Sequence, residues 1–527
     1  MKHSENDRYF GRFKSGIFAV FIFTTLFAIT SVATSFALEP QTGGADETRK
    51  SIKQAGKLTR AGLLSDAEAI LRRVIENDKR SSAAKVELAF VLTKQRKLGE
   101  AYSLVFPVAE AEPKNSRAYA VLGMVLLTAG RFVDARLIFY NSLKVNRQED
   151  LAWAGVGLVD FYENRITQSL ANLQEAVFHN NDEPDYLFAL AQVSSRAERY
   201  RDAADAYFRF LSVSKDTDKD RRERIKGLIG FLRFLGQKDG LYNSIGNESS
   251  NVNFELVGNR PVITLYINGR SEPLKFVLDT GSGITVISDK TAKLLKVKAI
   301  TRGGYAKGIG GDGRFEIIYG FLQQVDIGDV KVRNVPVYIR EFHDKAQKVD
   351  GYLGLAMISK FLTTIDYGSK TFALTKKDTD TRDFREKATI SLPLRLTSSG
   401  FLSGQVQLEG IESPLNFIVD TGASVSVISD RVANTKEILP YLSEEKLRVI
   451  GAAGITEGVP SFLLPRVSFG SHSRKLIEAI ALDLDLINEA SGFEQSGILG
   501  GNFLKNYSLT FDFKNSKVTF TSVTPEN

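Results

Sequence analysis

The sequence predicts a multidomain protein in which an all-α superhelix of helical repeats precedes an all-β half built from two related lobes. Two observations lead to this fold class. Small residues recur every 34 positions through the first half of the 527-residue chain. In the second half, residues 273–288 (PLKFVLDTGSGITVIS) and 414–429 (PLNFIVDTGASVSVIS) are near copies of each other. Each copy contains an apolar run that is typical of a strand buried on both faces.

The N-terminus has the pattern of an export signal. Four basic residues precede an uncharged, Phe- and Ile-rich stretch over residues 15–38, and residues 35–37 (Ser-Phe-Ala) have the small side chains of a signal-peptidase site. We therefore expect residues 1–37 to be a cleaved secretory signal, residues 38–47 to be a linker, and the remaining chain to be periplasmic or extracellular. The alternative is that residues 1–37 stay as a membrane anchor, because the uncharged stretch is just long enough to cross a bilayer.

Residues 48–235 are expected to form the helical repeats. Two series of small residues mark places where paired helices approach closely: Ala67, Ala101, Ala135, Ser169 and Ala203, and Ala55, Ala89, Gly123, Gly157 and Ala191. This period resembles that of tetratricopeptide (TPR) repeats, so about five repeats are expected, with a further helix to about Leu235. The resemblance implies a TPR-like superhelix whose concave face binds a peptide or protein partner, the alternative being a rigid spacer. Residues 236–252 are expected to be a linker.

The duplicated segment places one Asp at the end of each apolar strand. An isolated ionised carboxylate is costly to bury, so Asp279 and Asp420 each need a partner, and they can serve each other. Two carboxyl groups that meet cannot both ionise cheaply, and they therefore share a proton. The charged member can act as general base on a water molecule held between them, while the protonated member polarises a carbonyl group.

These segments resemble the retropepsin-like (clan AA) aspartic proteases. Each copy continues in the order of that family, with Asp-Thr-Gly followed by a glycine-rich segment at the place of a flap hairpin and then by an apolar-apolar-Gly strand. The resemblance implies an all-β bilobal acid-protease fold with two retropepsin-like lobes, over residues 253–375 and 388–521. A charged linker is expected over residues 376–387 and a short tail over residues 522–527.

The resemblance also implies a role for individual residues. The catalytic pair is Asp279 and Asp420. The residues expected to support the two catalytic loops are Thr280, Gly281 and Ser282 in the first lobe and Thr421, Gly422 and Ala423 in the second. The candidate flap residues, which would cover the substrate and exclude water, are Gly308, Ile309, Gly310 and Gly311 in the first lobe and Gly451, Ala452, Ala453 and Gly454 in the second.

The composition argues against other kinds of chemistry. The chain has no cysteine, which excludes thiol catalysis, and its four histidines are scattered without the spacing of a zinc site or a catalytic triad. The glycine-rich GIGGDG segment at residues 308–313 lacks the Lys-Ser/Thr that a phosphate-binding loop requires. A net charge of +7, with both signs interleaved, leaves no basic stripe for nucleic acid. We expect neither a metal nor a cofactor.

The function expected from the sequence is that of an exported aspartic endopeptidase acting on peptide or protein substrates, with the repeats recruiting a substrate or partner. The alternative is a catalytically inactive, peptide-binding scaffold. It is suggested by the first lobe, which has Leu355-Ala356 where the second has the more family-like Gly501-Asn502. Because one chain holds both lobes, a monomer with intramolecular lobe pairing is favoured, and pairing between two chains in a homodimer is the alternative.

Overall fold

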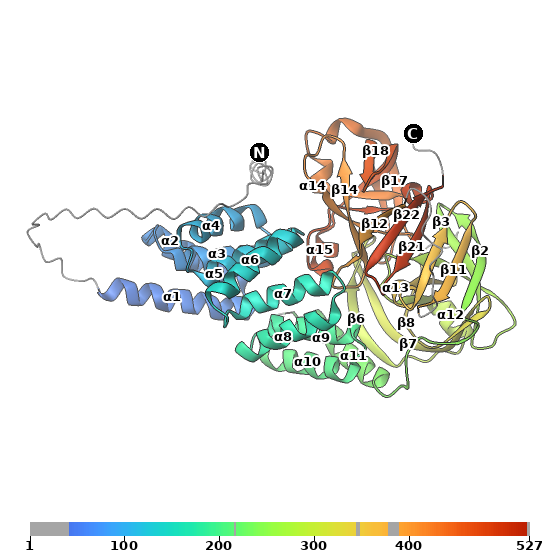
Figure 1. Ribbon diagram of the computed structural model, residues 1–527, viewed down its shortest axis with the longest axis horizontal. Coiled ribbons are helices and arrows are strands. Elements are labelled where there is room, and N and C mark those ends of the chain that lie inside the picture. Colours follow the sequence, from blue (N-terminus) through green and yellow to red (C-terminus); the bar gives the residue numbers. More distant parts are fainter. Residues whose placement is uncertain (1–41, 216–217, 344–347, 378–388, 524–527) are drawn as a thin grey trace, which may run out of the picture.

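The computed structural model describes residues 42–215, 218–343, 348–377 and 389–523. The first half of the chain is a stack of helices, the second half is built mainly from strands, and the two halves lie against each other (Figure 1). The expected export signal and most of the expected linker between the lobes lie outside the described residues. Within the described part of the chain, no helix combines the length and the apolar character needed to cross a membrane.

Eleven helices form the described part of the first half. They are α1 (Thr42–Arg60), α2 (Leu64–Asn77), α3 (Ser82–Lys94), α4 (Leu98–Ala111), α5 (Ser116–Thr128), α6 (Phe132–Val145), α7 (Asp150–Tyr162), α8 (Ile166–His179), α9 (Pro184–Arg196), α10 (Tyr200–Val213) and α11 (Lys219–Leu235). Consecutive helices pack on each other, so that α1 to α10 form five hairpins and α11 extends the stack. The predicted TPR-like superhelix is therefore present.

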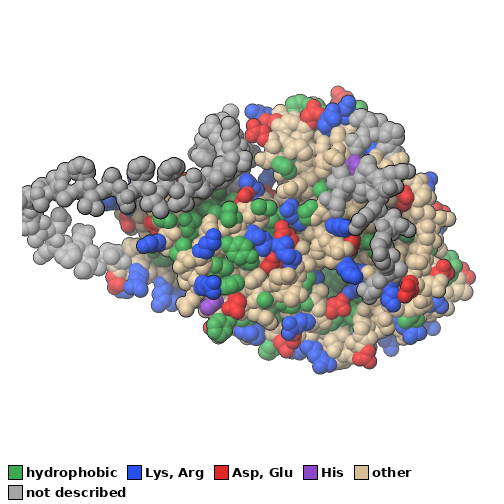
Figure 2. Space-filling model, viewed as in Figure 1, with side chains coloured by type: hydrophobic (Ala, Val, Ile, Leu, Met, Phe, Trp, Pro, Cys, Tyr) green, Lys and Arg blue, Asp and Glu red, His purple; other side chains and the backbone are tan. Residues whose placement is uncertain are grey.

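The 34-residue period arises from close helix packing. All ten of the small residues in the two series are buried. A Cβ atom on Gly123 of α5 would lie 2.5 Å from the Phe139 ring of α6, and one on Gly157 of α7 would lie 2.8 Å from Leu173 of α8. A larger residue at either glycine would push the paired helices apart. On the outer face of the stack, cationic, anionic and apolar side chains are interspersed (Figure 2).

The first lobe follows helix α11. Its elements are β1 (Asn243–Gly246), β2 (Ser249–Val257), β3 (Arg260–Ile267), β4 (Leu274–Asp279), β5 (Thr285–Ser288), α12 (Asp289–Leu294), β6 (Thr301–Lys307), β7 (Arg314–Ile327), β8 (Val330–Arg340), β9 (Gly351–Gly354), α13 (Leu355–Ile358), β10 (Phe361–Asp366) and β11 (Thr371–Lys376). Strand β9 pairs in parallel with β4 and antiparallel with β5, and β5 pairs in parallel with β8.

The expected linker over residues 236–252 is wrong in its second part, which contains β1 and the start of β2. Strand β1 pairs with β8, and β2 pairs with β11 and β3. These short polar segments give little strand signal in the sequence, because their pairing partners lie far along the chain.

The second lobe repeats this arrangement. Its elements are β12 (Thr389–Pro393), β13 (Arg395–Leu396), β14 (Leu402–Leu408), β15 (Leu415–Val419), β16 (Ser426–Ser429), α14 (Asp430–Ala433), a 3₁₀ turn (Leu439–Tyr441), β17 (Leu442–Gly451), β18 (Gly454–Phe469), β19 (His472–Leu482), α15 (Asp485–Ser491), β20 (Gly497–Leu499), α16 (Gly501–Leu504), β21 (Tyr507–Asp512) and β22 (Lys517–Ser522). Strand β20 pairs with β15 and β16, and β16 pairs in parallel with β19, so each pairing has its counterpart in the first lobe.

A shared sheet joins the two lobes. The C-terminal hairpin of the first lobe, β10–β11, lies beside the C-terminal hairpin of the second, β21–β22, because β10 pairs antiparallel with β21. At this junction the Thr364 and Thr510 hydroxyl oxygens are 2.9 Å apart and share a hydrogen bond. Phe372 and Phe511 are fully buried in the core of the sheet. The two lobes of one chain therefore have a fixed relative position.

The helical half contacts both lobes. Helix α11 packs on β6 of the first lobe, where the Thr301 hydroxyl donates a 2.8 Å hydrogen bond to the Gly227 carbonyl oxygen. Phe493 of the second lobe inserts into the core of the helical half, with its ring centroid 4.8 Å from that of Phe132 and 5.0 Å from that of Tyr162. The helical half is therefore docked against both lobes (Figure 1).

Candidate active site

The two Asp-Thr-Gly loops lie face to face between the lobes. Asp279 ends β4, and Asp420 directly follows β15. Behind each loop runs the predicted apolar-apolar-Gly strand, β9 in the first lobe and β20 in the second. Each Asp therefore lies at the end of a buried strand, at the edge of its lobe that faces the other lobe.

Two threonines lock the loops together. The Thr280 hydroxyl donates to the Val419 carbonyl oxygen at 2.7 Å and accepts from the Thr421 backbone NH at 3.1 Å. The Thr421 hydroxyl makes the mirror-image bonds, donating to the Leu278 carbonyl oxygen at 2.7 Å and accepting from the Thr280 backbone NH at 3.2 Å. Both threonine side chains are fully buried. Four hydrogen bonds thus cross between the lobes directly below the two carboxyl groups.

The glycines after the threonines let the carboxyl groups meet. A Cβ atom on Gly281 would lie 2.3 Å from Cγ of Asp420, and one on Gly422 would lie 2.6 Å from Oδ1 of Asp279. The Gly281 NH donates to Asp279 Oδ1 at 2.9 Å, and the Gly422 NH donates to Asp420 Oδ1 at 2.7 Å. Any side chain at these positions would occupy the space of the opposite carboxyl group, so both glycines are required by close approach.

Burial and mutual repulsion keep a proton on the pair. Loss of hydration raises the pKa of Asp279 well above its ordinary value, and the neighbouring Asp420 carboxylate raises it further. Burial also raises the pKa of Asp420, against the opposing effect of the Gly422 NH and of its hydrogen bond with Asp279. The two groups titrate together, and one proton stays between them at a pH where a free Asp would have lost it.

The fourth loop residue has the same place in both lobes. The Leu355 NH donates to the Ser282 carbonyl oxygen at 2.7 Å, and the Gly501 NH donates to the Ala423 carbonyl oxygen at 2.7 Å. The first turn of α13 or α16 is thereby fastened to its catalytic loop. The departure of the first lobe at Leu355 therefore leaves this backbone contact unchanged, because the bond involves no side chain.

The candidate flap residues form two hairpin tips that touch each other. Residues 308–313 connect β6 to β7, and residues 451–454 lie at the turn between β17 and β18. The Ala453 NH donates to the Ile309 carbonyl oxygen at 2.9 Å, and the Gly311 NH donates to the Ile455 carbonyl oxygen at 3.3 Å. The two lobes therefore meet at a second place, at the tips of these hairpins.

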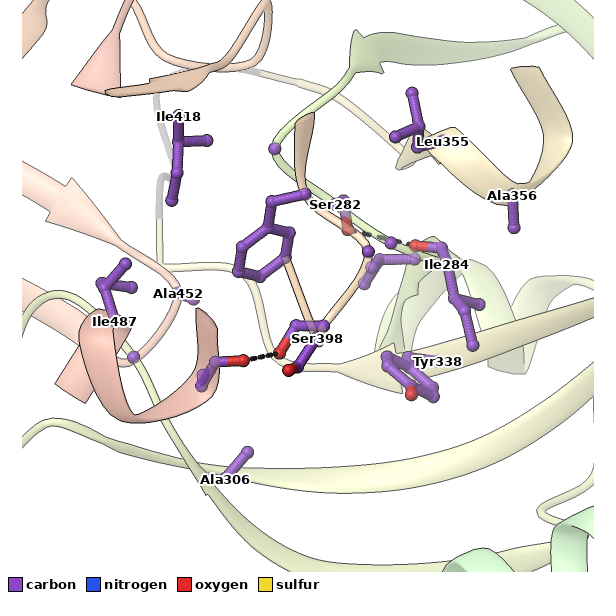
Figure 3. Close-up of a pocket in the computed structure, with 18 of the residues that line it drawn as sticks. Ser282, Ile284, Ala306, Tyr338, Leu355, Ala356, Ser398, Ile418, Ala452 and Ile487 are labelled. Atoms are coloured by element: carbon purple, nitrogen blue, oxygen red, sulfur yellow. Dashed lines mark hydrogen bonds between the residues drawn. The ribbon is translucent and has the colours of Figure 1, made fainter. Parts of the chain in front are cut away.

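A cavity of about 1450 Å³ lies between these two meeting places. Its lining includes the carboxyl groups of Asp279 and Asp420 and both hairpin tips. Apolar side chains from each lobe, such as Ile284 and Ile418, also line it (Figure 3). The lining combines apolar side chains with backbone groups that can form hydrogen bonds. Among the described residues, no cluster of three or more His, Cys, Asp or Glu side chains could hold a metal ion.

The helical half lines one side of the same cavity. Tyr162 of α7, Phe188 and Arg196 of α9, and Arg221 of α11 all reach it. Arg196 donates a 2.7 Å hydrogen bond to the carbonyl oxygen of Thr397, at the start of a second-lobe turn that continues through residues 398–400. Burial lowers the pKa of Arg196 to about 9.

This second-lobe turn was not predicted from the sequence. A Cβ atom on Gly283, next to the first catalytic loop, would lie 2.5 Å from the Ser399 carbonyl oxygen. The turn therefore packs between Arg196 of the helices and the loop that carries Asp279. No motif marks it, since its place follows from the docking of three parts of the chain. Sequence reasoning also missed Arg340, at the end of β8, which lines the cavity.

Paired carboxyl groups on facing loops, below two hairpin tips, define an aspartic-protease type of site. The family model of the aspartyl proteases matches the chain twice, over residues 263–357 and 404–503. Each match contains one Asp-Thr-Gly loop and its following apolar-apolar-Gly strand. The C-terminal half therefore consists of two aspartyl protease lobes in tandem, as the sequence predicts.

Solved structures of TPR proteins are similar to the helical half. A thermophilic TPR protein of Thermus thermophilus has 19% identity and a TM-score of 0.30, and the match covers 34% of this chain and 98% of that chain. The pilF protein of Pseudomonas aeruginosa has 16% identity and a TM-score of 0.28, with coverage of 37% of this chain and 88% of that chain. No curated protein matches the chain.

Proposed function

We propose that this protein is an exported aspartic endopeptidase that hydrolyses peptide bonds with a water molecule activated by Asp279 and Asp420. The observation that carries the proposal is the meeting of the two carboxyl groups over the crossed threonine bonds, since no structural need explains two buried acids placed against each other. Such a pair is costly to the fold and useful to hydrolysis.

In the proposed reaction, the two aspartates have different roles because only one of them carries the shared proton. The ionised carboxyl group takes a proton from the water as its oxygen attacks the carbonyl carbon of the peptide bond. The protonated carboxyl group donates its hydrogen bond to the carbonyl oxygen, on which negative charge develops. The amine then leaves with a proton from the pair, and the two groups return to the singly protonated state.

The hairpin tips and the helical half are proposed to hold the substrate. The tips contact each other across the cavity, so a peptide below them would be shielded from bulk water. The side chains of α7, α9 and α11 that reach the cavity support a role of the repeats in receiving the substrate, and their concave face remains a candidate site for a protein partner.

The proposal also includes export from the cytoplasm and a monomer as the working form. The basic and apolar N-terminal segment supports export to a periplasm or the cell exterior. The shared sheet and the crossed threonine bonds, all formed within one chain, support a monomer as the working form. Mixing the inactive Asp279→Asn and Asp420→Asn variants tests this point, because restored activity would mean that lobes pair between chains.

The direct test is cleavage of a peptide library by the wild-type protein and by the two Asp→Asn variants over acidic to neutral pH. We expect cleavage by the wild type, its loss in each variant and unchanged far-ultraviolet circular dichroism. Asp289→Asn is the matched control, since Asp289 lies on the surface of the same lobe in an ion pair with Lys293 at 3.4 Å. Absence of cleavage at every pH would instead favour the peptide-binding scaffold.

A further inference from the structure

One position of the duplicated site carries a charged side chain in the first lobe and an apolar one in the second. Arg340 ends β8 opposite Ser288, and in the second lobe the equivalent position at the end of β19, opposite Ser429, is Leu482. The two serines each stand nine residues after a catalytic Asp, so the correspondence is fixed by the register of the strands. Both Arg340 and Leu482 line the cavity. At this position the duplicated site therefore carries a cation in the first lobe and an apolar side chain in the second.

The surroundings of Arg340 hold its guanidinium group in place. Its central carbon lies 4.9 Å from the ring centroid of Phe342, 5.7 Å from that of Tyr352 and 5.8 Å from that of Phe315. Its Nη1 atom donates to the carbonyl oxygen of Ala452, at the tip of the second hairpin, at 3.3 Å. Three aromatic rings and one backbone bond thus fix the orientation of the side chain without neutralising its charge.

Arg340 has capacity left for a ligand. Within the described part of the chain, its guanidinium group forms no ion pair with a carboxylate, and only Nη1 donates hydrogen bonds, to Ala452 and to the adjacent Glu341 carbonyl oxygen. Asp279 is close enough for the positive charge of Arg340 to act on it, although the two form no ion pair. A guanidinium group presents five N–H donors, so most of its fork is free to bind a carboxylate.

We propose that Arg340 selects peptide substrates that carry an Asp or Glu side chain close to the scissile bond, on the side of the bond that lies against the first lobe. This inference rests on the proposed endopeptidase function and names its substrate class. A partly buried, charge-assisted and bidentate bond favours an acidic side chain over its neutral amide by roughly 10- to 100-fold. The apolar Leu482 on the other side provides no such preference.

The experiment maps every cut in a pool of random decapeptides by mass spectrometry at about pH 6, where Asp and Glu side chains are ionised. For the wild-type protein we expect Asp and Glu to exceed Asn and Gln by roughly tenfold or more at one position within two residues of the cut. Arg340→Leu gives the first lobe the residue that the second lobe has at this position, and it should abolish the acidic preference among the peptides that the variant cuts.

Leu482→Arg is a variant whose effect cannot result from misfolding. It should create a second acidic preference on the opposite side of the scissile bond. Cleavage by the wild type without an acidic preference, or an unchanged preference in Arg340→Leu, would overturn the inference.

If the wild-type protein cuts nothing, the proposed function fails and the inference is decided by binding. The same pool is passed over immobilised wild-type and Arg340→Leu protein. Retained peptides enriched in Asp and Glu only on the wild type would support Arg340 as the binding group, and equal retention would overturn it.

Discussion

Replacing one of the crossed threonines by valine should destabilise the protease half without changing its shape. Valine has nearly the same volume as threonine but no hydroxyl, so Thr280→Val leaves the Val419 carbonyl oxygen and the Thr421 NH without their bonds of 2.7 and 3.1 Å. Both groups lie beside a fully buried side chain, where water cannot replace the bond. At about 1–3 kcal/mol for each unsatisfied buried group, the loss is about 2–6 kcal/mol.

Hydrogen exchange of peptides from β4 and β15 at increasing urea concentration measures this loss, because the single tryptophan, Trp153, lies in α7 and the tyrosines lie in both halves of the chain. Thr280→Ser is the matched control. It keeps the hydroxyl and removes one methyl group, and should cost about 1 kcal/mol. By the symmetry of the site, Thr421→Val should resemble Thr280→Val. A Thr280→Val protein that is within about 0.5 kcal/mol of the wild type would refute the reasoning.

Three further experiments test other parts of the structure. Because burial raises the pKa of Asp279, the folded state holds its proton more tightly than the unfolded chain, so wild-type stability falls as pH rises above the ordinary 3.8. Asp279→Asn removes this loss, so its melting temperature should exceed that of the wild type by an amount that increases from pH 4 to pH 7. A difference in melting temperature that is the same at every pH would contradict the raised pKa of the buried Asp279. Gly227→Ala places a Cβ atom 2.1 Å from the Arg302 carbonyl oxygen and should cost about 1–3 kcal/mol. Gly56→Ala, in open space on α1, should be neutral or stabilising by up to about 1 kcal/mol, and equal effects of the two would refute the α11–β6 contact. In hydrogen exchange, amides of the mostly exposed β17 should exchange roughly tenfold or more faster than those of β6, which α11 covers, and equal rates would contradict that protection.

The sequence predicted those parts of the fold that depend on local pattern or on duplication. The 34-residue period located the helix contacts, because close packing at Gly123 and Gly157 admits only small residues. The strands β4 and β15 were recognisable by the apolar runs at residues 276–278 and 417–419, which are buried. Strand β1 and the start of β2 were not, since these segments are mostly polar and are placed by pairing with β8 and β11.

The candidate site divides in the same way. Asp279, Asp420 and their threonines and glycines follow from the repeated motif, and the structure places all of them around one pair of carboxyl groups. Arg196 could not be predicted, because it reaches the cavity only through the docking of the helical half. Arg340 left one signal in the sequence. An alignment of the two copies that continued past the motif would have set it against Leu482.

The symmetry of the two lobes ends where the site must distinguish one side from the other. The two Asp-Thr-Gly loops are nearly identical because each threonine and glycine contacts the opposite lobe, so a change in one copy would affect both. The hairpins contact each other only at their tips, and their remaining residues are free of this constraint. The hairpin of the first lobe is held by α11. Arg224 Nη1 donates to the Tyr305 carbonyl oxygen at 2.9 Å, and Arg314 forms an ion pair with Asp220 at 2.8 Å. Strand β17 of the other hairpin is largely exposed. The hairpin of the first lobe is therefore packed against a helix, whereas much of the hairpin of the second lobe is exposed, so the two sides of the cavity differ. Arg340 adds to this difference, because it also belongs to the first lobe.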